Sequence, residues 1–200
     1  MKKMIQSLLV AVFMVFAGSA TAQTTWTIDK THTNVGFTVT HMVVSEVSGR
    51  FKDFSGSVVT NGDDFTGAKI DVNIKTASVN TDNDYRDGHL KSDDFFGSEK
   101  FADATFKSTS FEKVSDKKYK VTGELTIKGV TKTVVLDATL GGIITLPDGS
   151  KKAGFKATTE INRFDFGLNW NKMVEAGAIV DKTVTIQLNI ELDNKAEVKK

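Results

Sequence analysis

The run Tyr85-Arg86-Asp87-Gly88-His89-Leu90 brings an arginine, a carboxylate and a histidine together within a few positions. Such a trio could bind an anion or transfer a proton, because arginine makes bidentate contacts with anions and histidine titrates near neutral pH. The run interrupts a sequence that otherwise mostly alternates apolar and polar residues. It is therefore either the rim of a site or a long connection with a structural role.

The other residues that could take part in catalysis are scattered. His32, His41 and His89 have no metal-ligand spacing such as H-x-x-x-H, and the sequence has no cysteine, no G-x-S-x-G turn and no glycine-rich phosphate loop. The two Asp-Asp pairs in the sequence are better explained as turn and cap residues. We predict no catalytic residue, metal or cofactor. The alternative is a hydrolase or isomerase that uses His41 and the cluster at residues 86–89.

The flanking segments have the period-2 pattern of half-buried β-strands. Residues 34–40, 70–75 and 184–192 alternate most clearly, and His41 is in phase with the apolar face at the end of its strand. Gly141-Gly142 and Pro147-Asp148-Gly149 predict turns around a short strand at 143–146.

Short helical turns are predicted for the interruption, around residues 82–97. Asp82 or Asp84 is expected to cap the first turn, and Ser92 to cap the second. The segment Arg163-Phe164-Asp165-Phe166 predicts a corner in which Arg163 pairs locally and the phenylalanines plug one end of the fold.

Roughly eight to nine strands with one apolar face favour an all-β fold that curls into a barrel. An outer-membrane barrel is not expected, because the polar faces carry Lys, Asp and Glu where a lipid face would be apolar. The protein is therefore not expected to span a membrane.

The first residues predict a cleavable export signal. Lys2 and Lys3 precede a short apolar stretch that ends in Ala20-Thr21-Ala22, so residues 1–22 are expected to be removed after Ala22, giving a protein of the periplasm. Loss of two lysines changes the formal net charge from +1 to −1, which does not favour a nucleic-acid partner. Residues 23–194 are expected to form the domain, and residues 195–200 a charged, flexible tail.

Several segments, in order over nearly the whole chain, resemble the YceI-like family of periplasmic polyisoprenoid-binding proteins. They are Trp26-Thr27-Ile28-Asp29 with Thr31-His32-Thr33, Phe37-Thr38-Val39-Thr40-His41, Val47-Ser48-Gly49-Arg50-Phe51, Tyr85-Arg86-Asp87-Gly88-His89-Leu90, Ser92-Asp93-Asp94-Phe95-Phe96, Gly123-Glu124-Leu125-Thr126-Ile127-Lys128-Gly129-Val130-Thr131-Lys132, and Asn162-Arg163-Phe164-Asp165-Phe166-Gly167. The sequence departs from the family pattern at Thr33, where serine is common, and at Ala102-Asp103, which replaces a proline-containing pair.

The resemblance implies a lipocalin-like, extended, antiparallel eight-stranded barrel that sequesters or transports an isoprenoid-type lipid or a similar long-chain amphiphile. It also hints at a homodimer. The residues expected to line the lipid tail are Phe37, Val39, Phe51, Val72, Ile74, Phe106, Val121, Leu125, Leu136, Phe155, Ala157 and Ile186.

The expected head-group or rim residues are His41, Arg86, Asp87 and His89, with Arg86 suited to a pyrophosphate or quinone head. Three alternatives stay open. The apolar residues could fill a solid core, Arg86 and Asp87 could pair with each other to hold the interruption over the barrel, and the protein could be a ligand-free, stress-linked interaction protein.

Overall fold

A computed structural model describes residues 23–174 and 177–195. The predicted export signal at residues 1–22 lies outside these residues, as does all but the first residue of the predicted tail at 195–200. None of the helices in the described ranges is long and apolar enough to cross a membrane.

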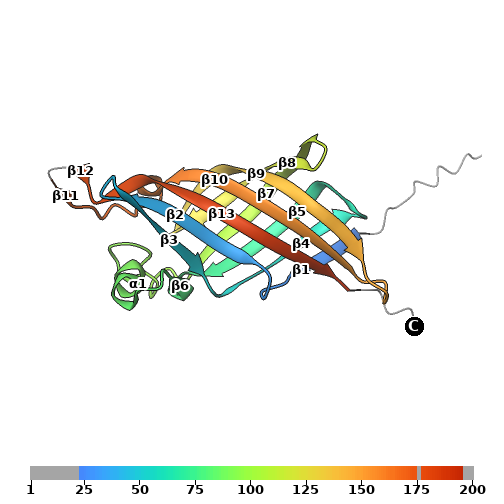
Figure 1. The fold of residues 1–200 in the computed structure, drawn as a ribbon, viewed down its shortest axis with the longest axis horizontal. Coiled ribbons are helices and arrows are strands. Elements are labelled where there is room, and N and C mark those ends of the chain that lie inside the picture. The colour runs from blue at the N-terminus through green and yellow to red at the C-terminus, as the bar shows by residue number, and fades with distance from the viewer. Residues whose placement is uncertain (1–22, 175–176, 196–200) are drawn as a thin grey trace, which may run out of the picture.

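The described residues form thirteen β-strands, one α-helix and two short 3₁₀-helices (Figure 1). In chain order they are β1 (Gln23–Ile28), β2 (Asn34–His41), β3 (Ser45–Phe51), β4 (Phe54–Asn61), β5 (Asp64–Lys75), η1 (Thr76–Ser78), β6 (Val79–Asn80), α1 (Asp84–Lys91), β7 (Asp103–Ser115), β8 (Lys118–Ile127), β9 (Val130–Thr145), β10 (Lys151–Asn162), η2 (Arg163–Phe166), β11 (Met173–Val174), β12 (Gly177–Ala178) and β13 (Val180–Asn194).

Six of these strands combine in pairs, so that the barrel has eight long strands. β1 and β2 pair with the same edge of β13, one after the other, and together make one long strand. β3 pairs with β2 and β4 pairs with β1, so β3 and β4 make the next long strand. β5 pairs with β4 and β6 pairs with β3, so β6 continues β5 as the third. The remaining neighbours follow chain order from β5 through β7, β8, β9 and β10 to β13. Every pairing is antiparallel, and the sheet closes where Thr27 and Ile28 pair with Asp193 and Leu192. The predicted eight-stranded antiparallel barrel is confirmed.

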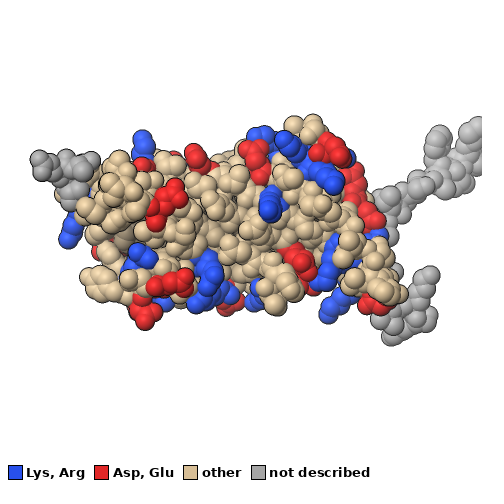
Figure 2. Space-filling model, in the orientation of Figure 1, with Lys and Arg blue, Asp and Glu red and all other residues tan. Residues whose placement is uncertain are grey.

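The two faces of the sheet carry different residues, as the alternation predicts. Oppositely charged side chains are register partners on the outer face. Lys107 Nζ lies 2.9 Å from Asp71 Oδ2, and Lys120 Nζ lies 2.6 Å from Asp137 Oδ1. Figure 2 shows acidic and basic side chains interspersed over the visible face. These pairs are exposed, so they contribute little stability individually.

The buried apolar residues form two clusters, one toward each end of the barrel. At the end that holds the β4–β5 and β7–β8 turns, aromatic rings from five strands pack together, with the Phe65 ring centroid 4.8 Å from Phe155 and 5.3 Å from Trp26. Trp26 Nε1 donates to Thr60 Oγ1 at 3.1 Å, which satisfies the one polar atom of its ring. The rings that form this cluster are Trp26, Phe65, Phe111, Tyr119 and Phe155.

At the opposite end, two long connections lie against the barrel. One carries α1 and the other carries η2, β11 and β12 (Figure 1). The helical prediction for residues 82–97 is confirmed by α1 and by the turns that follow it, but the predicted cap is wrong. Asn83 is the N-cap, and its Oδ1 accepts from the main-chain N–H of Arg86 at 2.9 Å. Asp82 lies outside the helix with φ of 57°, and Asp84 is the first helical residue.

The prediction of a turn at Gly141-Gly142 is also wrong, because β9 continues through both glycines. Gly154 of β10 pairs with Gly142 and Phe155 pairs with Leu140, so Gly141 is the extra residue of a β-bulge. A pair of glycines is compatible with a turn or with a bulged strand, and here the pairing with β10 keeps β9 extended.

An inward-facing glycine makes room for a ring on the neighbouring strand. A Cβ atom built on Gly123 would collide with the ring of Phe106 and would lie 2.6 Å from the main-chain oxygen of Lys107. The backbone cannot move away without breaking the pairing of β7 with β8.

We therefore expect Gly123→Ala to lower the free energy of unfolding by about 1–3 kcal/mol, the usual cost of overpacking. Gly88→Ala is the matched control, since a Cβ at this helical position meets nothing within 4 Å. The control should raise stability by about 0.5–1 kcal/mol. Urea unfolding monitored by circular dichroism measures both, and equal stability of Gly123→Ala and the wild type would contradict the packing described.

Candidate functional site

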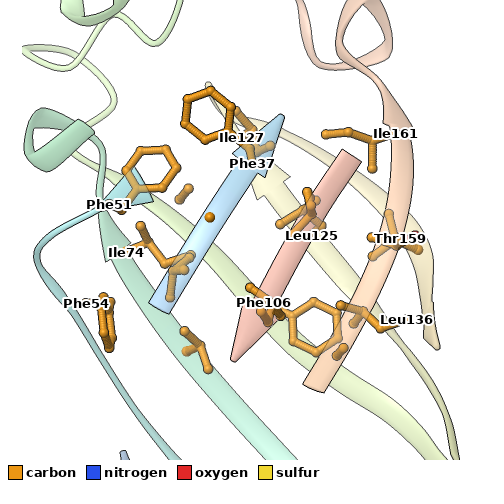
Figure 3. A pocket seen from close by; sticks show the side chains of 18 of the residues that line it. Phe37, Phe51, Phe54, Ile74, Phe106, Leu125, Ile127, Leu136, Thr159 and Ile161 are labelled. Carbon is orange, nitrogen blue, oxygen red and sulfur yellow. The ribbon is translucent and has the colours of Figure 1, made fainter. Parts of the chain in front are cut away.

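A cavity of about 250 Å³ lies inside the barrel between the two clusters (Figure 3). Side chains of all eight long strands, of α1 and of both long connections form its wall. The wall is apolar except for Thr33, Thr159 and Arg163.

All twelve residues predicted to line a lipid tail lie on this wall. Figure 3 shows Phe37, Phe51, Ile74, Phe106 and Leu125 directed into the same space from different strands. That a ligand contacts these residues stays a prediction. Further wall residues have the same strand parity and could have been predicted by extending each alternating run; they include Val35, Ile70, Ile127, Val134, Ile161, Val184 and Leu188.

The size and lining of the cavity decide what can occupy it. An apolar cavity of 150 Å³ in another protein stays dry and binds small hydrocarbons, because water finds no hydrogen-bond partners there. Left empty, a void of 250 Å³ costs about 6 kcal/mol, at ~24 cal/mol per Å³. The solid core that was the alternative to a lined cavity does not describe the middle of the barrel.

The connection between β6 and β7 supplies one cover of the cavity. Leu90, Phe95 and Phe96 lie on the cavity wall. The ring of Phe96 meets that of Phe51 edge-on at 5.5 Å, and the Phe95 ring lies 5.4 Å from that of Trp170 on the other long connection. The cover is therefore packed against both the barrel and its neighbouring connection.

Arg86 and Asp87 hold this cover in place through a shared partner. Arg86 donates from Nε to Thr81 Oγ1 at 2.8 Å and from Nη2 to the Thr81 carbonyl at 2.9 Å. Asp87 is 5% exposed and accepts from the N–H and the hydroxyl of Thr81 and from Asn80 Nδ2. No ion pair between Arg86 and Asp87 occurs in the described structure. The expected structural role is thus served by Thr81 rather than by a direct Arg–Asp pair.

Of the two remaining rim candidates, His89 has side-chain partners close by. His89 Nε2 lies 2.8 Å from Asp94 Oδ2, and its ring meets Phe95 and Trp170 edge-on at 5.1 and 4.9 Å. His41 ends β2 opposite Ser45 and Val180. Neither histidine, nor Arg86 or Asp87, lies on the wall of the cavity as the described residues form it. Their contact with a head group stays a prediction.

Arg163 is the charged residue on the cavity wall, and its role there was not foreseen. It is 3% exposed and begins η2, where β10 ends. Its guanidinium donates to main-chain carbonyls of the corner it belongs to, as predicted, and also to carbonyls at the start of β13, which the prediction did not include. These carbonyls belong to Leu168, Trp170, Val180 and Asp181.

The two phenylalanines of this corner differ in position. Phe166 is 2% exposed and lies on the cavity wall, so it plugs the barrel as expected. Phe164 is 38% exposed. Its ring makes a cation–π contact with Arg163, whose Cζ lies 4.5 Å from the ring centroid. The expectation for Phe164 was wrong, because side chains two positions apart in a 3₁₀-helix, with three residues per turn, point in different directions.

Lys128, in the β8–β9 turn, joins the two covers. Its ammonium donates to the carbonyl of Asp93 at 2.7 Å and to that of Gly167 at 3.4 Å. The residue has a positive φ of 51° and Gly129 follows at 75°, so the tight turn directs the lysine toward both connections.

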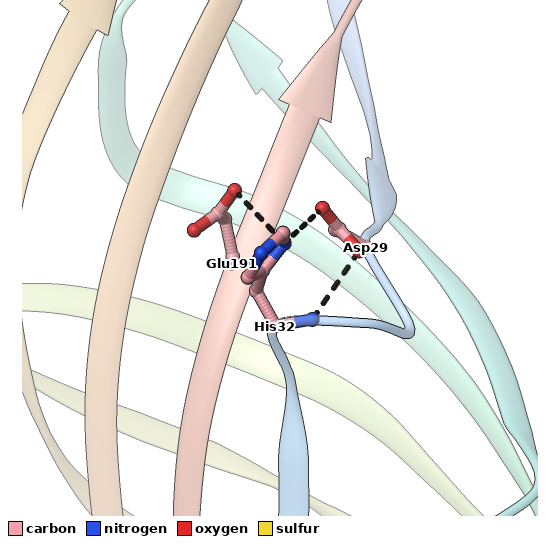
Figure 4. Close-up of side chains that lie close together, drawn as sticks. All are labelled: Asp29, His32 and Glu191. Carbon is pink, nitrogen blue, oxygen red and sulfur yellow. Dashed lines mark hydrogen bonds and ion pairs between the residues drawn. The ribbon is translucent and has the colours of Figure 1, made fainter.

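A second polar cluster lies on the outside of the barrel, where the chain passes from β1 to β2 (Figure 4). Asp29, His32 and Glu191 place one ligand atom each within 4.8 Å of one another, an arrangement able to hold a metal ion. The ammonium of Lys152 already lies 2.6 Å from Glu191 and 3.6 Å from Asp29. Because this lysine supplies the positive charge, we interpret the cluster as an ionic fastening of the β1–β2 connection to β13.

The contacts of this fastening shift the pKa values of Asp29 and His32. The hydrogen bond from His32 holds the pKa of Asp29 well below its usual 3.8, helped by the N–H of Thr31. The same contact raises the pKa of His32 above 6.5, with a smaller contribution from Glu191. His32 Nδ1 lies 2.8 Å from Asp29 Oδ2.

Comparisons with known proteins agree with this fold. A family model for the YceI-like domain matches residues 26–192. A UPF0312 protein of Staphylococcus aureus is 39% identical over 158 residues, which is 78% of this chain and 90% of the relative. The solved YCEI protein of Campylobacter jejuni is 40% identical with a TM-score of 0.64, covering 84% of this chain and 96% of that one. A polyisoprenoid binding domain from Saccharophagus degradans has a TM-score of 0.62 at 19% identity, over 85% of this chain and 98% of its own.

The outer fastening predicts a pH-dependent effect of His32→Gln. Ionised Asp29 stabilises the fold above pH 3.8, because its pKa is lowered in the folded state. Protonated His32 stabilises the fold fully below pH 6.5, and this stabilisation is lost as the pH rises through the raised pKa of His32 in the folded state. The stability difference between wild type and variant should therefore be larger at about pH 5 than at about pH 9. Urea midpoints at both pH values measure it. His41→Gln serves as a control, and a His32→Gln effect independent of pH would exclude the ion pair as its cause.

Proposed function

The chain belongs to the YceI-like family, and we propose that it is a binding protein that encloses the long apolar tail of an isoprenoid-type lipid or similar amphiphile. It sequesters or transports this lipid and does not catalyse a reaction. The observation that carries the proposal is the apolar cavity of about 250 Å³ inside a closed barrel.

The dimensions of the barrel favour a slender ligand. Eight strands enclose room for side chains or for one narrow molecule. The wall is contributed by rings and aliphatic chains from every strand, so a tail would be desolvated on all sides. Burial of apolar area at about 25 cal/mol per Å² then supplies affinity without any specific polar contact. The polyisoprenoid binding domain of Saccharophagus degradans, which has the same fold, is consistent with this ligand class.

The proposed place of action is the periplasm, reached by an export signal at residues 1–22 that is cleaved after Ala22. Shielding a water-insoluble tail is the task that a barrel of this kind would perform in an aqueous compartment. N-terminal sequencing of the protein from its native host, together with fractionation, tests the location. Gel filtration of the same sample tests the homodimer that the family resemblance predicts.

The binding proposal is tested by identifying the molecule that purifies with the protein. The chain is expressed in cells that make isoprenoid quinones, extracted with organic solvent and analysed by mass spectrometry. We expect a reproducible long-chain lipid in stoichiometric amount. Protein that is folded but repeatedly free of lipid would contradict the proposal. Loss of a turnover on substitution of His41 and His89, with lipid uptake intact, would favour the enzyme alternative.

A cavity-filling variant makes the test specific to the interior. Ala157 lies on the cavity wall in β10, between Ala138 and Leu188 of the neighbouring strands. We expect Ala157→Phe to reduce the co-purified lipid to background, because its ring occupies the space of the tail. The existing void should keep the stability change within about 1.5 kcal/mol.

Thr158→Phe is the matched control, since Thr158 is the next residue of the same strand and is exposed on the outer face. The control should carry as much lipid as the wild type. If Ala157→Phe retains a full complement of lipid while the protein stays folded, the tail does not occupy this cavity.

A further inference from the structure

We propose that the barrel docks on the surface of a lipid bilayer through the end that carries the two long connections, and that the β2–β3 turn, Met42-Val43-Val44, inserts its side chains there. The inference rests on the proposed function, because it names the place where the enclosed lipid is taken up or released. Three observations carry it: the exposure of these side chains, the strain of the turn and its position beside the cavity.

Exposed apolar side chains are concentrated at this end of the barrel. Val43 is 70% exposed, Val44 is 85% exposed, and Met173 at the start of β11 is 75% exposed. Nine large apolar side chains are exposed in the described ranges, and three of them belong to β7 and β9. The other six belong to this end and are Met42, Val43, Val44, Tyr85, Phe164 and Met173. Clustered apolar exposure marks a contact surface, whereas scattered single residues do not.

The turn and the neighbouring connection form one surface (Figure 1). The N–H of Met42 donates to the carbonyl of Ile179 at 2.9 Å, and the N–H of Ile179 donates to the carbonyl of Lys172, which precedes β11, at 2.9 Å. Val43 lies against β12, because a Cβ atom built on Gly177 would be 3.9 Å from Val43 Cγ2. Main-chain hydrogen bonds therefore hold the exposed side chains of the turn and of β11 at the same end.

The β2–β3 turn is strained, and the strain has no structural purpose. The N–H of Val44 donates to the carbonyl of His41 at 3.2 Å, and φ is 51° at Met42 and 65° at Val43. Positive φ at both central residues of a two-residue hairpin is the mark of a type I′ turn, which favours Asn-Gly. A β-branched residue is an outlier at such a φ.

Another turn of the barrel shows the sequence that this geometry usually selects. The β8–β9 turn also has two central residues with positive φ, and they are Lys128 and Gly129. The β2–β3 turn has Met42 and Val43 instead, although a polar residue and a glycine would form it with less strain. Stability does not explain why apolar side chains occupy an exposed turn of this type, whereas contact with an apolar phase does.

The turn lies close to the cavity. It continues β2, and Val39 of that strand lies on the cavity wall three positions before Met42. Val180, which pairs with His41 at the end of β2, lies on the wall as well. Three residues of a strand span about 10 Å. Insertion of the turn into a bilayer therefore brings the covered end of the cavity to the lipid surface.

The charge and the size of the surface fit a bilayer better than a second copy of the chain. Residues 34–49 include one Asp, Glu, Lys or Arg, namely Glu46, and Lys172 lies beside Met173. The surface therefore has no excess of one charge. A stable protein interface draws about 20–30 residues from each partner, many more than a turn and β11 supply. A fluid bilayer needs no complementary shape, and its affinity grows with the apolar area that enters it.

Replacing the turn by Asn-Gly separates docking from stability. We expect Met42→Asn/Val43→Gly to raise the urea midpoint, because both new residues accept a positive φ. The same variant should sediment with phosphatidylcholine vesicles about tenfold less, because two apolar side chains no longer enter the bilayer. The protein is prepared from Gln23 onward, since the apolar residues of the expected export signal would bind vesicles themselves. Loss of binding in a more stable protein cannot be caused by unfolding.

Val114→Asn is the matched control, because Val114 is an exposed valine of β7 at the opposite end of the barrel. Its binding to vesicles should equal that of the wild type. Adding phosphatidylglycerol to the vesicles, or raising the salt to about 1 M to screen charges, should leave the binding of the wild type unchanged. Binding that requires the anionic lipid and is lost in salt would overturn the proposal, because charge would then carry the contact.

Insertion can also be measured directly at the turn. The sequence has no cysteine, so Val44→Cys provides a single attachment point for a polarity-sensitive fluorophore. Phosphatidylcholine vesicles should shift its emission to shorter wavelengths, and the same label on Val114→Cys should not respond. Equal emission with and without vesicles for the label on Val44→Cys would contradict insertion of the turn.

Three further results would overturn the docking proposal. They are a wild type that does not bind vesicles, a folded Met42→Asn/Val43→Gly variant that binds as well as the wild type, and dissociation of a dimer by this variant in gel filtration. The last result would make the turn a contact between two copies. Each of them leaves the proposed function intact if lipid still purifies with the protein. Vesicle binding through the turn by a protein that never carries lipid would support docking and count against the proposed function.

Discussion

A sheet that closes on itself has no free edge, and its inner face must be apolar along the whole length of every strand. This constraint governs the rest of the molecule. Strands of up to sixteen residues, such as β9, make the barrel long, and an extended barrel has more interior than its side chains occupy. The rings at one end and the apolar side chains of the covers at the other fill the two ends, and a cavity remains between them.

Closing the second end of a barrel creates a different problem, because connections that cross an apolar opening bring polar main-chain groups with them. Here, long cationic side chains donate hydrogen bonds to several of those carbonyls. Arg163 collects four carbonyls, and Lys128 holds one carbonyl from each connection. Buried Asp87 performs the complementary task for the N–H of Thr81. The covers are thus held by polar contacts at their margins and by apolar packing toward the cavity.

The strand pattern was predictable from the sequence because inward-facing residues repeat at every second position, and this is why all twelve predicted tail positions lie on the cavity wall. The roles of the polar residues were harder to predict. Arg163 and the carbonyl of Asp181 are eighteen positions apart, and Asp29 meets Glu191 only because the barrel closes. Local rules also failed where neighbours competed, as with Asn83, which caps α1 although aspartates flank it. Contacts between distant segments leave no periodic signal.

The seam between β1 and β13 has a consequence for how the chain acquires its structure. β13 pairs with β10 on one side and with β1 and β2 on the other, so residues more than 160 positions apart must meet before the sheet closes. Loop-closure entropy of this kind makes folding slow. Until β13 docks, the outer edges of β1, β2 and β10 are unpaired and the apolar interior is open to water. A chain in which β13 has not yet docked therefore exposes both unpaired strand edges and apolar surface, the two features that favour aggregation, and leaves the space that becomes the cavity open.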